Sequence, residues 1–167
     1  MTRDSSITPA ETLATKQVRE LGVDEQSMLV VSNIFRVSNL VRNYTERHLL
    51  NEYGLTFSGF TVLWVLWVNG KTESRALAEE SGVSKSTLTG IVNTLEKNAL
   101  VTRKPHAHDG RRVFVHTTAK GRATMKKVFP VFNSIEALFT SDLSVREKDA
   151  LIRSLRIILH TLDAENG

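Results

Sequence analysis

Residues 73–97 read ESRALAEESGVSKSTLTGIVNTLEK, and this stretch decides the fold. It contains two short helical patterns, residues 73–81 and 85–97, separated by a three-residue break. Ala78 is small enough to let two helices approach closely, and Gly82 can supply the positive φ with which a chain leaves a helix. The spacing predicts a helix-turn-helix, whose two helices cross at a steep angle. A helical turn in an unrelated helical protein is the alternative.

The second helix of this pair has a start that suits contact with nucleic acid. Ser84 is placed to cap it, so that the first turn presents hydroxyl side chains beside free backbone N–H groups. Such a start can contact phosphate and enter a DNA groove. Among the outward-facing positions, Asn93 can pair with adenine, Lys85 can reach guanine or phosphate, and Thr89 can contact a thymine methyl group. A solvent-exposed helix face with no partner is the alternative.

A basic β-hairpin is expected directly after this helix. Residues 100–105 and 111–117 predict two strands around an Asp109-Gly110 turn, because Asp-Gly between alternating apolar residues is a strong hairpin signal. A basic ribbon can follow the narrow minor groove, where the negative potential attracts guanidinium groups. We expect Asp109 to brace Arg111 or to shape the turn, although solvated turn charge is the alternative. A helix-turn-helix followed by such a hairpin is a winged helix-turn-helix.

Most of the remaining chain has helical patterns. Residues 1–24 form a polar tail that can hold a short helix. Further helices are expected at residues 25–52, at residues 57–68 after a Thr56 cap, from Thr118 towards Asn133 with Pro130 as a kink, and after a Ser144–Glu147 capping box. The 57–68 pattern is apolar on every side, which places it in the middle of the fold, with a strand over 62–68 as the competing interpretation. The last helix is expected to bury Leu151, Leu155, Ile158, Leu159 and Leu162. The fold class is therefore mainly α with a small β-hairpin wing.

Charge is segregated along the chain in a way that favours a polyanionic partner. The 167 residues carry 22 Lys and Arg against 18 Asp and Glu, a formal net charge of +4. Residues 70–127 hold 12 of the basic and 5 of the acidic residues, so their balance is +7 and that of the remainder is −3. Phosphate neutralisation requires such a basic module, and a solvated basic face is the alternative.

Other classes of protein are disfavoured by what the sequence lacks. Cys is absent, which excludes disulfides, thiolate metal sites and Cys nucleophiles. No Gly-rich phosphate loop, H-E-x-x-H pair or nucleophile elbow is present, so we expect no enzyme and no cofactor. The N-terminus has no apolar signal region and the apolar 62–68 run is too short to span a bilayer, so we expect a cytoplasmic protein without a membrane partner. His106 and His108 at the hairpin tip have no Cys or Glu beside them, so we expect no metal site.

Over residues 26–162 the sequence resembles the MarR family of bacterial transcription regulators. The matching residues follow one another in the family's order: Leu55-Thr56, Phe60, Val62-Leu63, Leu77-Ala78, Gly82-Val83-Ser84, Thr87, Leu95-Glu96, Leu100-Val101, Arg103, Asp109, Arg111, Val113, Val115, Thr118 and Gly121. There are departures, since the family often has Arg or Lys at the positions of Gly90 and Thr94 and has Gly at the position of Ala99. These departures put the operator sequence in doubt and leave the fold unaffected.

The resemblance implies a homodimer that binds double-stranded DNA. The dimerisation region would be residues 25–52 and 122–167, with 53–121 as the winged helix-turn-helix domain and 1–24 as an N-terminal extension. The recognition helices would enter successive major grooves, and an Asp109-braced Arg111 would reach the minor groove. The expected DNA-binding residues are Arg75, Ser84, Lys85, Ser86, Thr87, Thr89, Gly90, Asn93, Arg103, Lys104, Asp109, Arg111 and Arg112. The leucine stripe of the last helix fits dimerisation, and it also fits a plain intrachain core.

The resemblance further implies a small-molecule effector, because the family commonly binds small aromatic acids that release DNA. The expected ligand-binding residues are Arg42, Tyr44, His48, Phe60 and Trp64, with Arg42 or His48 meeting a carboxylate. Ordinary core aromatics are the alternative for each of these residues. Two other functions remain open at this stage: a winged helix used as a protein-interaction module, and a metal-responsive regulator that uses His residues. We expect a repressor.

Overall fold

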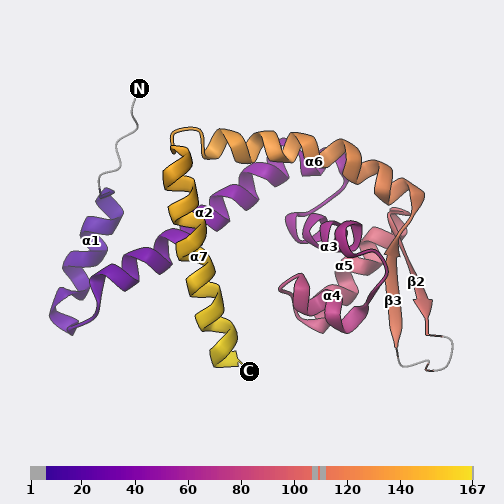
Figure 1. The fold of residues 1–167 in the computed structure, drawn as a ribbon, viewed down its shortest axis with the longest axis horizontal. Coiled ribbons are helices and arrows are strands. Elements are labelled where there is room, and N and C mark those ends of the chain that lie inside the picture. Colours follow the sequence, from indigo (N-terminus) through magenta and orange to yellow (C-terminus); the bar gives the residue numbers. More distant parts are fainter. Residues whose placement is uncertain (1–6, 107–108, 110–111, 167) are drawn as a thin grey trace. The chain divides into compact units, whose positions relative to one another are not determined.

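The computed structural model describes residues 7–106, 109 and 112–166. Contacts divide the chain into two compact units, of which the larger is Asp24–Phe132 and the smaller combines Met1–Val23 with Asn133–Gly167. The larger unit contains α2 (Glu25–His48), the 3₁₀ turn η2 (Leu50–Tyr53), α3 (Phe57–Asn69), β1 (Thr72–Glu73), α4 (Ser74–Glu80), α5 (Lys85–Lys97), β2 (Val101–Pro105), β3 (Val113–Thr117) and the first part of α6 (Ala119–Phe139). This element order confirms the predicted winged helix-turn-helix and the mainly α fold class (Figure 1).

Helix α3 is the centre of the larger unit, as its all-round apolar pattern predicted. It buries Phe60, Val62, Leu63, Val65 and Leu66 and packs against α4, α5 and β3. The Thr56 hydroxyl caps its start by accepting a hydrogen bond from the Gly59 N–H at 3.0 Å. The competing strand interpretation of residues 62–68 is therefore wrong, because all of these residues belong to α3.

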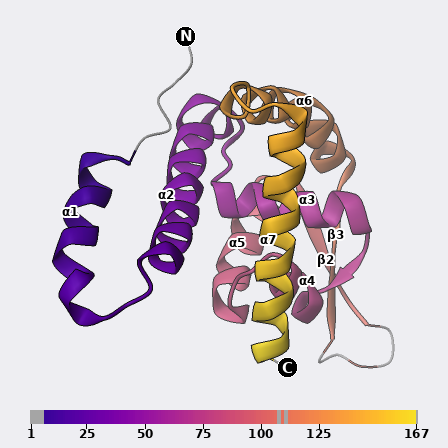
Figure 2. The ribbon, with the colours of Figure 1, turned by 60° about the vertical axis from the view of Figure 1, so that its left-hand side comes forward.

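The sheet has three antiparallel strands in the order β1-β3-β2. The expected hairpin is present, with Val101 opposite Thr117 and Pro105 opposite Val113. The β2–β3 ribbon lies beside the helices of this unit, with β3 contacting α3 and α4 and β2 contacting α5 (Figures 1 and 2). Strand β1 was not predicted, since Glu73 was expected to begin a helix; instead Glu73 pairs with Phe114 of β3, and α4 begins one residue later.

Several helix boundaries differ from the expectation. The long helix ends at His48 rather than at residue 52, because the chain tightens into η2 and leaves it through Gly54 at φ 64°. Helix α6 continues to Phe139, beyond the expected end near Asn133, and Pro130 lies inside it.

The smaller unit contains α1 (Pro9–Val18), the 3₁₀ turn η1 (Arg19–Leu21), the end of α6 and α7 (Val145–Asn166). The short helix expected in the N-terminal tail is α1, and a Thr8–Glu11 capping box starts it. The Ser144–Glu147 capping box is confirmed, with the Ser144 N–H donating to Glu147 Oε2 at 2.8 Å and the Glu147 N–H donating to Ser144 Oγ at 3.3 Å.

The expected burial of the α7 leucine stripe is wrong within a single chain. Leu151 is 48 % exposed, Leu159 is 58 % exposed and Leu162 is 52 % exposed. Leu155 and Ile158 are half-buried, and the helix runs to Asn166 instead of fraying after Asp163. The apolar period of a helix does not distinguish a face that packs on its own chain from one left for another molecule.

Candidate nucleic-acid interface

The helix-turn-helix is formed by α4 and α5, and its turn contains the predicted glycine in the left-handed conformation. Gly82 ends α4 at φ 64°, and the Val83 N–H returns to the Ala78 carbonyl at 3.0 Å. Leu77 is fully buried and Ala78 is 5 % exposed, so the two helices meet through small and apolar side chains. Glycine is favoured at this turn because the left-handed conformation costs an L-residue about 1–2 kcal/mol.

The start of α5 carries a cluster of hydroxyl groups. Ser84 Oγ accepts a hydrogen bond from the Thr87 N–H at 3.1 Å and lies 2.8 Å from the Thr87 hydroxyl and 2.9 Å from that of Ser86. These contacts confirm the predicted N-cap. They hold three exposed hydroxyls at the positive end of the helix dipole, where a phosphate oxygen would be stabilised.

The outward face of α5 is the one expected from the helical period. All of its predicted DNA-contacting side chains are exposed, namely Lys85, Ser86, Thr87, Thr89, Gly90 and Asn93, whereas Leu88, Val92 and Leu95 are buried. A groove of about 400 Å³ brings part of this face together with other elements. It is lined by Glu73, Ser74, Arg75, Lys85, Leu88, Thr89, Val92, Asn93, Arg103 and Val113.

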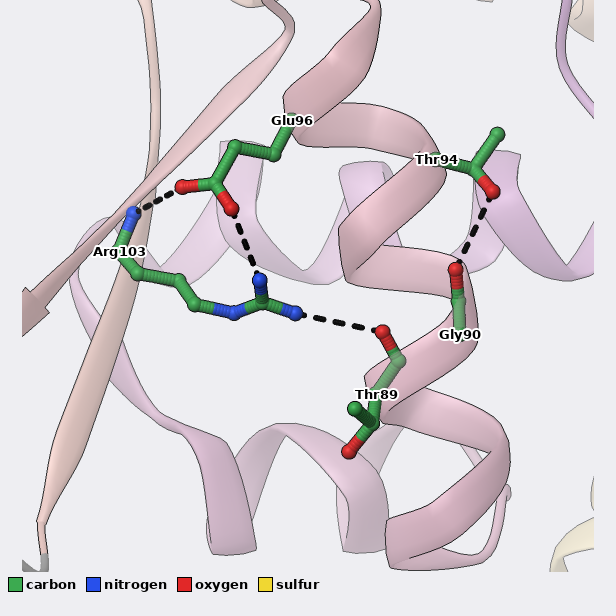
Figure 3. Close-up of polar contacts among 5 residues, drawn as sticks. All are labelled: Thr89, Gly90, Thr94, Glu96 and Arg103. Carbon is green, nitrogen blue, oxygen red and sulfur yellow. Dashed lines mark hydrogen bonds and ion pairs between the residues drawn. The ribbon is translucent and has the colours of Figure 1, made fainter.

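Arg103, on β2, points towards α5 and contacts it at two places. Its Nη1 donates to Glu96 Oε2 at 2.8 Å, and its Nη2 donates to the Thr89 backbone carbonyl at 3.2 Å (Figure 3). Its backbone N–H also donates to Glu96 Oε1 at 3.0 Å. The predicted site residue Arg103 is therefore bound to the recognition helix.

Arg112 is held on the other side of the wing. Its Nη2 lies 2.6 Å and its Nε 3.0 Å from Glu73 Oε2, so that the wing is joined to β1. This hydrogen bond is the largest reason why the pKa of the Glu73 carboxyl is lowered and the pKa of Arg112 is raised. The role of Glu73 as the partner of Arg112 was not predicted from the sequence, because it depends on the pairing of β1 with β3.

The wing tip is described in part. Lys104 and Asp109 are exposed, and the Asp109 carbonyl accepts a hydrogen bond from the Arg112 N–H at 3.0 Å. Arg111, which was expected to be braced by Asp109, lies outside the described residues, as does His108. The remaining tip histidine, His106, lies beside the ring of Phe114, with 5.9 Å between ring centroids.

The described residues form neither a cluster of metal ligands nor a membrane-spanning helix. No group of three or more His, Cys, Asp and Glu side chains there could hold a metal ion. None of the helices in the described ranges combines the length and apolar character needed to cross a membrane.

The residues expected to bind an effector fall into small aromatic groups. Arg42 lies over the Phe57 ring at 5.1 Å, and the rings of Tyr44 and His48 are 4.2 Å apart on the exposed side of α2. Phe60 is buried and stacks on Phe132 at 4.4 Å, while Trp64 stacks on Phe129 at 4.4 Å. The aromatic rings of α3 thus contact each other and α6.

Comparison with known proteins decides the family. The chain is 30% identical over 149 residues, 87% of each chain, to the uncharacterized HTH-type transcriptional regulator YwaE of Bacillus subtilis. A family model described as transcriptional regulator SarA/Rot matches residues 46–128. Sco3205, a MarR family regulator from Streptomyces coelicolor solved in complex with DNA, has a TM-score of 0.75 at 22% identity, covering 84% of this chain and 89% of its own. The chain belongs to the MarR family.

A second solved structure is similar over most of the chain. NadR, solved in complex with 4-hydroxyphenylacetate, has a TM-score of 0.65 at 26% identity, covering 78% of this chain and 91% of its own. As a MarR-family protein the chain is a DNA-binding transcriptional regulator and not an enzyme. Its groove between α5 and the wing is therefore the nucleic-acid interface to be tested.

Ala99 is the departure from the MarR family pattern that the structure explains best. It adopts φ 58°, the left-handed conformation that glycine favours, and it is the one non-glycine among the described residues with a positive φ. The Leu100 N–H still returns to the Leu95 carbonyl at 2.9 Å, so the end of α5 keeps the geometry that a glycine would give.

Proposed function

We propose that this MarR-family regulator is a homodimeric repressor that binds a pseudo-palindromic DNA operator and is released by a small aromatic acid. The observation that carries the proposal is the exposed face of α5 next to the wing, which presents hydroxyl, amide and amine groups over one groove. Such a face suits the major groove, in which each base pair presents a distinct set of donors and acceptors.

The dimer is supported by exposed apolar side chains on two helices. Ile157 is 67 % exposed and Leu159 is 58 % exposed on α7, and on α2 Phe35 is 65 % exposed and Leu40 is 66 % exposed. Apolar stripes of this kind favour association with a second copy, because a monomer rarely leaves a large contiguous patch in water.

We assign dimerisation to residues 25–52 and 122–167 and DNA binding to residues 53–121. Sedimentation should give a dimer, and Leu159→Glu should give a monomer; a monomeric wild type would contradict the assignment.

The proposed DNA contacts are of two kinds, contacts with bases and contacts with phosphates. Asn93 should read bases from the middle of α5, and Lys104 should contact phosphate from the wing. Both side chains are exposed. On a labelled duplex that the protein selects from a random-sequence pool, Asn93→Ala should weaken binding by about 1–3 kcal/mol and leave non-specific duplex unaffected. Lys104→Ala should weaken both duplexes and lower the slope of log K against log salt by about 0.9. If Asn93→Ala weakened both duplexes equally, this division would be wrong.

The other expected contacts complete the interface. Arg75, Ser84, Ser86 and Thr87 would bind phosphates, and Gly90 would let the DNA approach the α5 backbone. From the family resemblance, Arg111 at the wing would reach the minor groove, and Arg111→Ala should cost about 1–3 kcal/mol of binding free energy. An unchanged affinity of that variant in a gel-shift titration would remove Arg111 from the site.

The effector proposal rests on the aromatic groups and on one relative. NadR was solved with 4-hydroxyphenylacetate bound. In this chain the Arg42 guanidinium beside the Phe57 ring offers a cation next to aromatic surface, which suits an aromatic carboxylate. Adding 4-hydroxyphenylacetate should quench Trp64 and Trp67 fluorescence and lower affinity for the selected duplex, and Arg42→Gln should abolish both effects. Unchanged DNA affinity across a panel of aromatic acids would leave a regulator without such an effector.

Repression can be separated from activation with a reporter. The selected duplex is placed over the promoter of a reporter gene, and the chain is expressed in the same cells. Expression of the reporter should fall, and Asn93→Ala should restore it because base contacts are lost. A rise in reporter expression would identify an activator.

A further inference from the structure

Strand β2 lies at the edge of the sheet, since it pairs with β3 on one side only. An edge strand leaves backbone N–H groups without ladder partners, and each needs another acceptor when it is partly buried. The Arg103 N–H finds its acceptor on α5, where it donates to Glu96 Oε1 at 3.0 Å. The recognition helix thus takes the place of a neighbouring strand at this point.

The same carboxylate also binds the Arg103 side chain. Glu96 Oε2 accepts from Arg103 Nη1 at 2.8 Å, and the guanidinium reaches further along α5 to the Thr89 carbonyl, at 3.2 Å from Nη2 (Figure 3). The Arg103 side chain is 29% exposed and that of Glu96 is 37% exposed, so the pair is partly shielded from water. Three hydrogen bonds therefore connect one residue of the wing to two places on α5 that are about two helical turns apart.

These contacts leave Arg103 poorly suited to a DNA phosphate. Its charge is balanced by Glu96, and two nitrogens of its guanidinium already have acceptors. Thr89, which the guanidinium holds through its carbonyl, belongs to the face of α5 that is exposed for base contact. We propose that Arg103 is a positioning residue, which together with Glu96 fixes the wing relative to the recognition helix so that both meet DNA in one arrangement.

The physical basis is preorganisation. A wing that moved freely against α5 would have to be ordered when both elements bind, and that ordering would reduce the affinity. Arg103 is suited to the task because its planar fork can bond two acceptors in different directions, which a lysine ammonium on a flexible stem does less well.

The proposal is tested with a fluorescein-labelled duplex that the wild-type protein selects from a random-sequence pool. Glu96→Gln should weaken binding about fivefold to tenfold, because the fork to Arg103 loses its charge. Electrostatics alone predicts the opposite, since the variant removes a negative charge beside the DNA. Glu165→Gln on α7 is the matched control for the change in net charge and should bind like the wild type. If Glu96→Gln bound as tightly as the wild type or more tightly, the positioning role would be refuted.

Two further variants separate positioning from phosphate contact. Arg103→Lys keeps the positive charge and would preserve a phosphate contact, yet it should weaken binding as much as Glu96→Gln does. The double variant, Arg103→Lys with Glu96→Gln, should bind no more weakly than either single variant, because both changes break the same connection. Additive losses, or wild-type affinity in Arg103→Lys, would overturn the proposal.

A readout without DNA completes the test. Hydrogen exchange of the Arg103 amide should become faster in Glu96→Ala, since that N–H loses its side-chain acceptor while the β2–β3 ladder is retained. Unfolding in urea shows whether each variant is folded before its affinity is measured. An Arg103 amide that exchanged at the wild-type rate in Glu96→Ala would contradict the connection itself.

Discussion

Gly121→Ala tests a close approach of α6 to the backbone of Leu100. A Cβ at Gly121, near the start of α6, would lie 2.0 Å from the Leu100 carbonyl oxygen and 3.0 Å from the Leu100 carbonyl carbon. The Leu100 backbone cannot easily retreat, because its carbonyl also accepts from the Thr118 N–H at 3.0 Å and its N–H closes the end of α5. The added methyl group therefore has to push α6 away from the segment that joins α5 to the wing.

The size of the effect follows from two opposing contributions. Alanine is favoured over glycine in a helix by about 1 kcal/mol. Overpacking costs about 1–3 kcal/mol, and contact with backbone places this site at or above the upper end of that range. We expect a net loss of about 2 kcal/mol in the free energy of unfolding, or about 4–8 °C in Tm for a chain of this size. Gly90→Ala is the matched control: nothing lies within 4 Å of a Cβ there, so the same change should add about 0.5–1 kcal/mol.

The assay is urea unfolding at fixed protein concentration, followed by the fluorescence of Trp64 and Trp67 on α3, which belongs to the same unit as Gly121. The two variants carry the same chemical change, so the sign of the difference isolates the steric contact with Leu100. If Gly121→Ala were as stable as the wild type while Gly90→Ala gained stability, the close packing of α6 on Leu100 would be refuted.

Three other changes have expected outcomes in unfolding experiments. Ala99→Gly should add about 0.5–1 kcal/mol in urea unfolding, because glycine adopts φ 58° without strain. Arg112 holds the pKa of Glu73 below its ordinary value of 4.5, so the Glu73 carboxylate stabilises the fold fully above pH 4.5. This stabilisation is lost as the pH falls from 4.5 through the lower pKa of the folded protein. In a pH series of urea midpoints, Glu73→Gln should not show this loss. Burial and three nearby cations hold the pKa of His116 below 6.5, so the fold should lose stability as the pH drops from 6.5 through the pKa of the folded protein. In His116→Gln, the urea midpoint should change less with pH over this range. An NMR titration that placed the His116 pKa at or above 6.5 would contradict the last expectation.

The sequence was sufficient for the parts of the fold that local chemistry specifies. Gly82 requires a left-handed turn, Ser84 and Thr56 cap the helices that follow them, and an Asp-Gly pair lies between the two strands of the wing. Each of these signals lies within a few residues of the structure that it determines. The exposed side of α5 followed from the helical period alone once its start at Lys85 was known.

The missed features depend on residues that are distant in the sequence. Strand β1 has two residues and no alternating pattern, so Glu73 could be placed opposite Phe114 only by the fold. The pairing of Glu73 with Arg112, 39 residues away, follows from that unpredicted strand. The α7 stripe was ambiguous for another reason, because Leu159 and its neighbours have the same period in a core and in an interface.

The ion pairs also change what the basic charge of residues 70–127 means for DNA binding. Two arginines of this segment, Arg103 and Arg112, are each paired with a glutamate of another element, whereas the pair of Arg75 with Glu79 is exposed and lies within α4. A count of cations would credit both Arg103 and Arg112 to phosphate, whereas the slope of log K against log salt follows only the phosphates that are actually neutralised. Exposed lysines on α5 and β2, Lys85 and Lys104, have no such role in joining the elements. We therefore expect a salt slope set mainly by the lysines, while Arg103 and Arg112 at the wing determine how the reading elements are held.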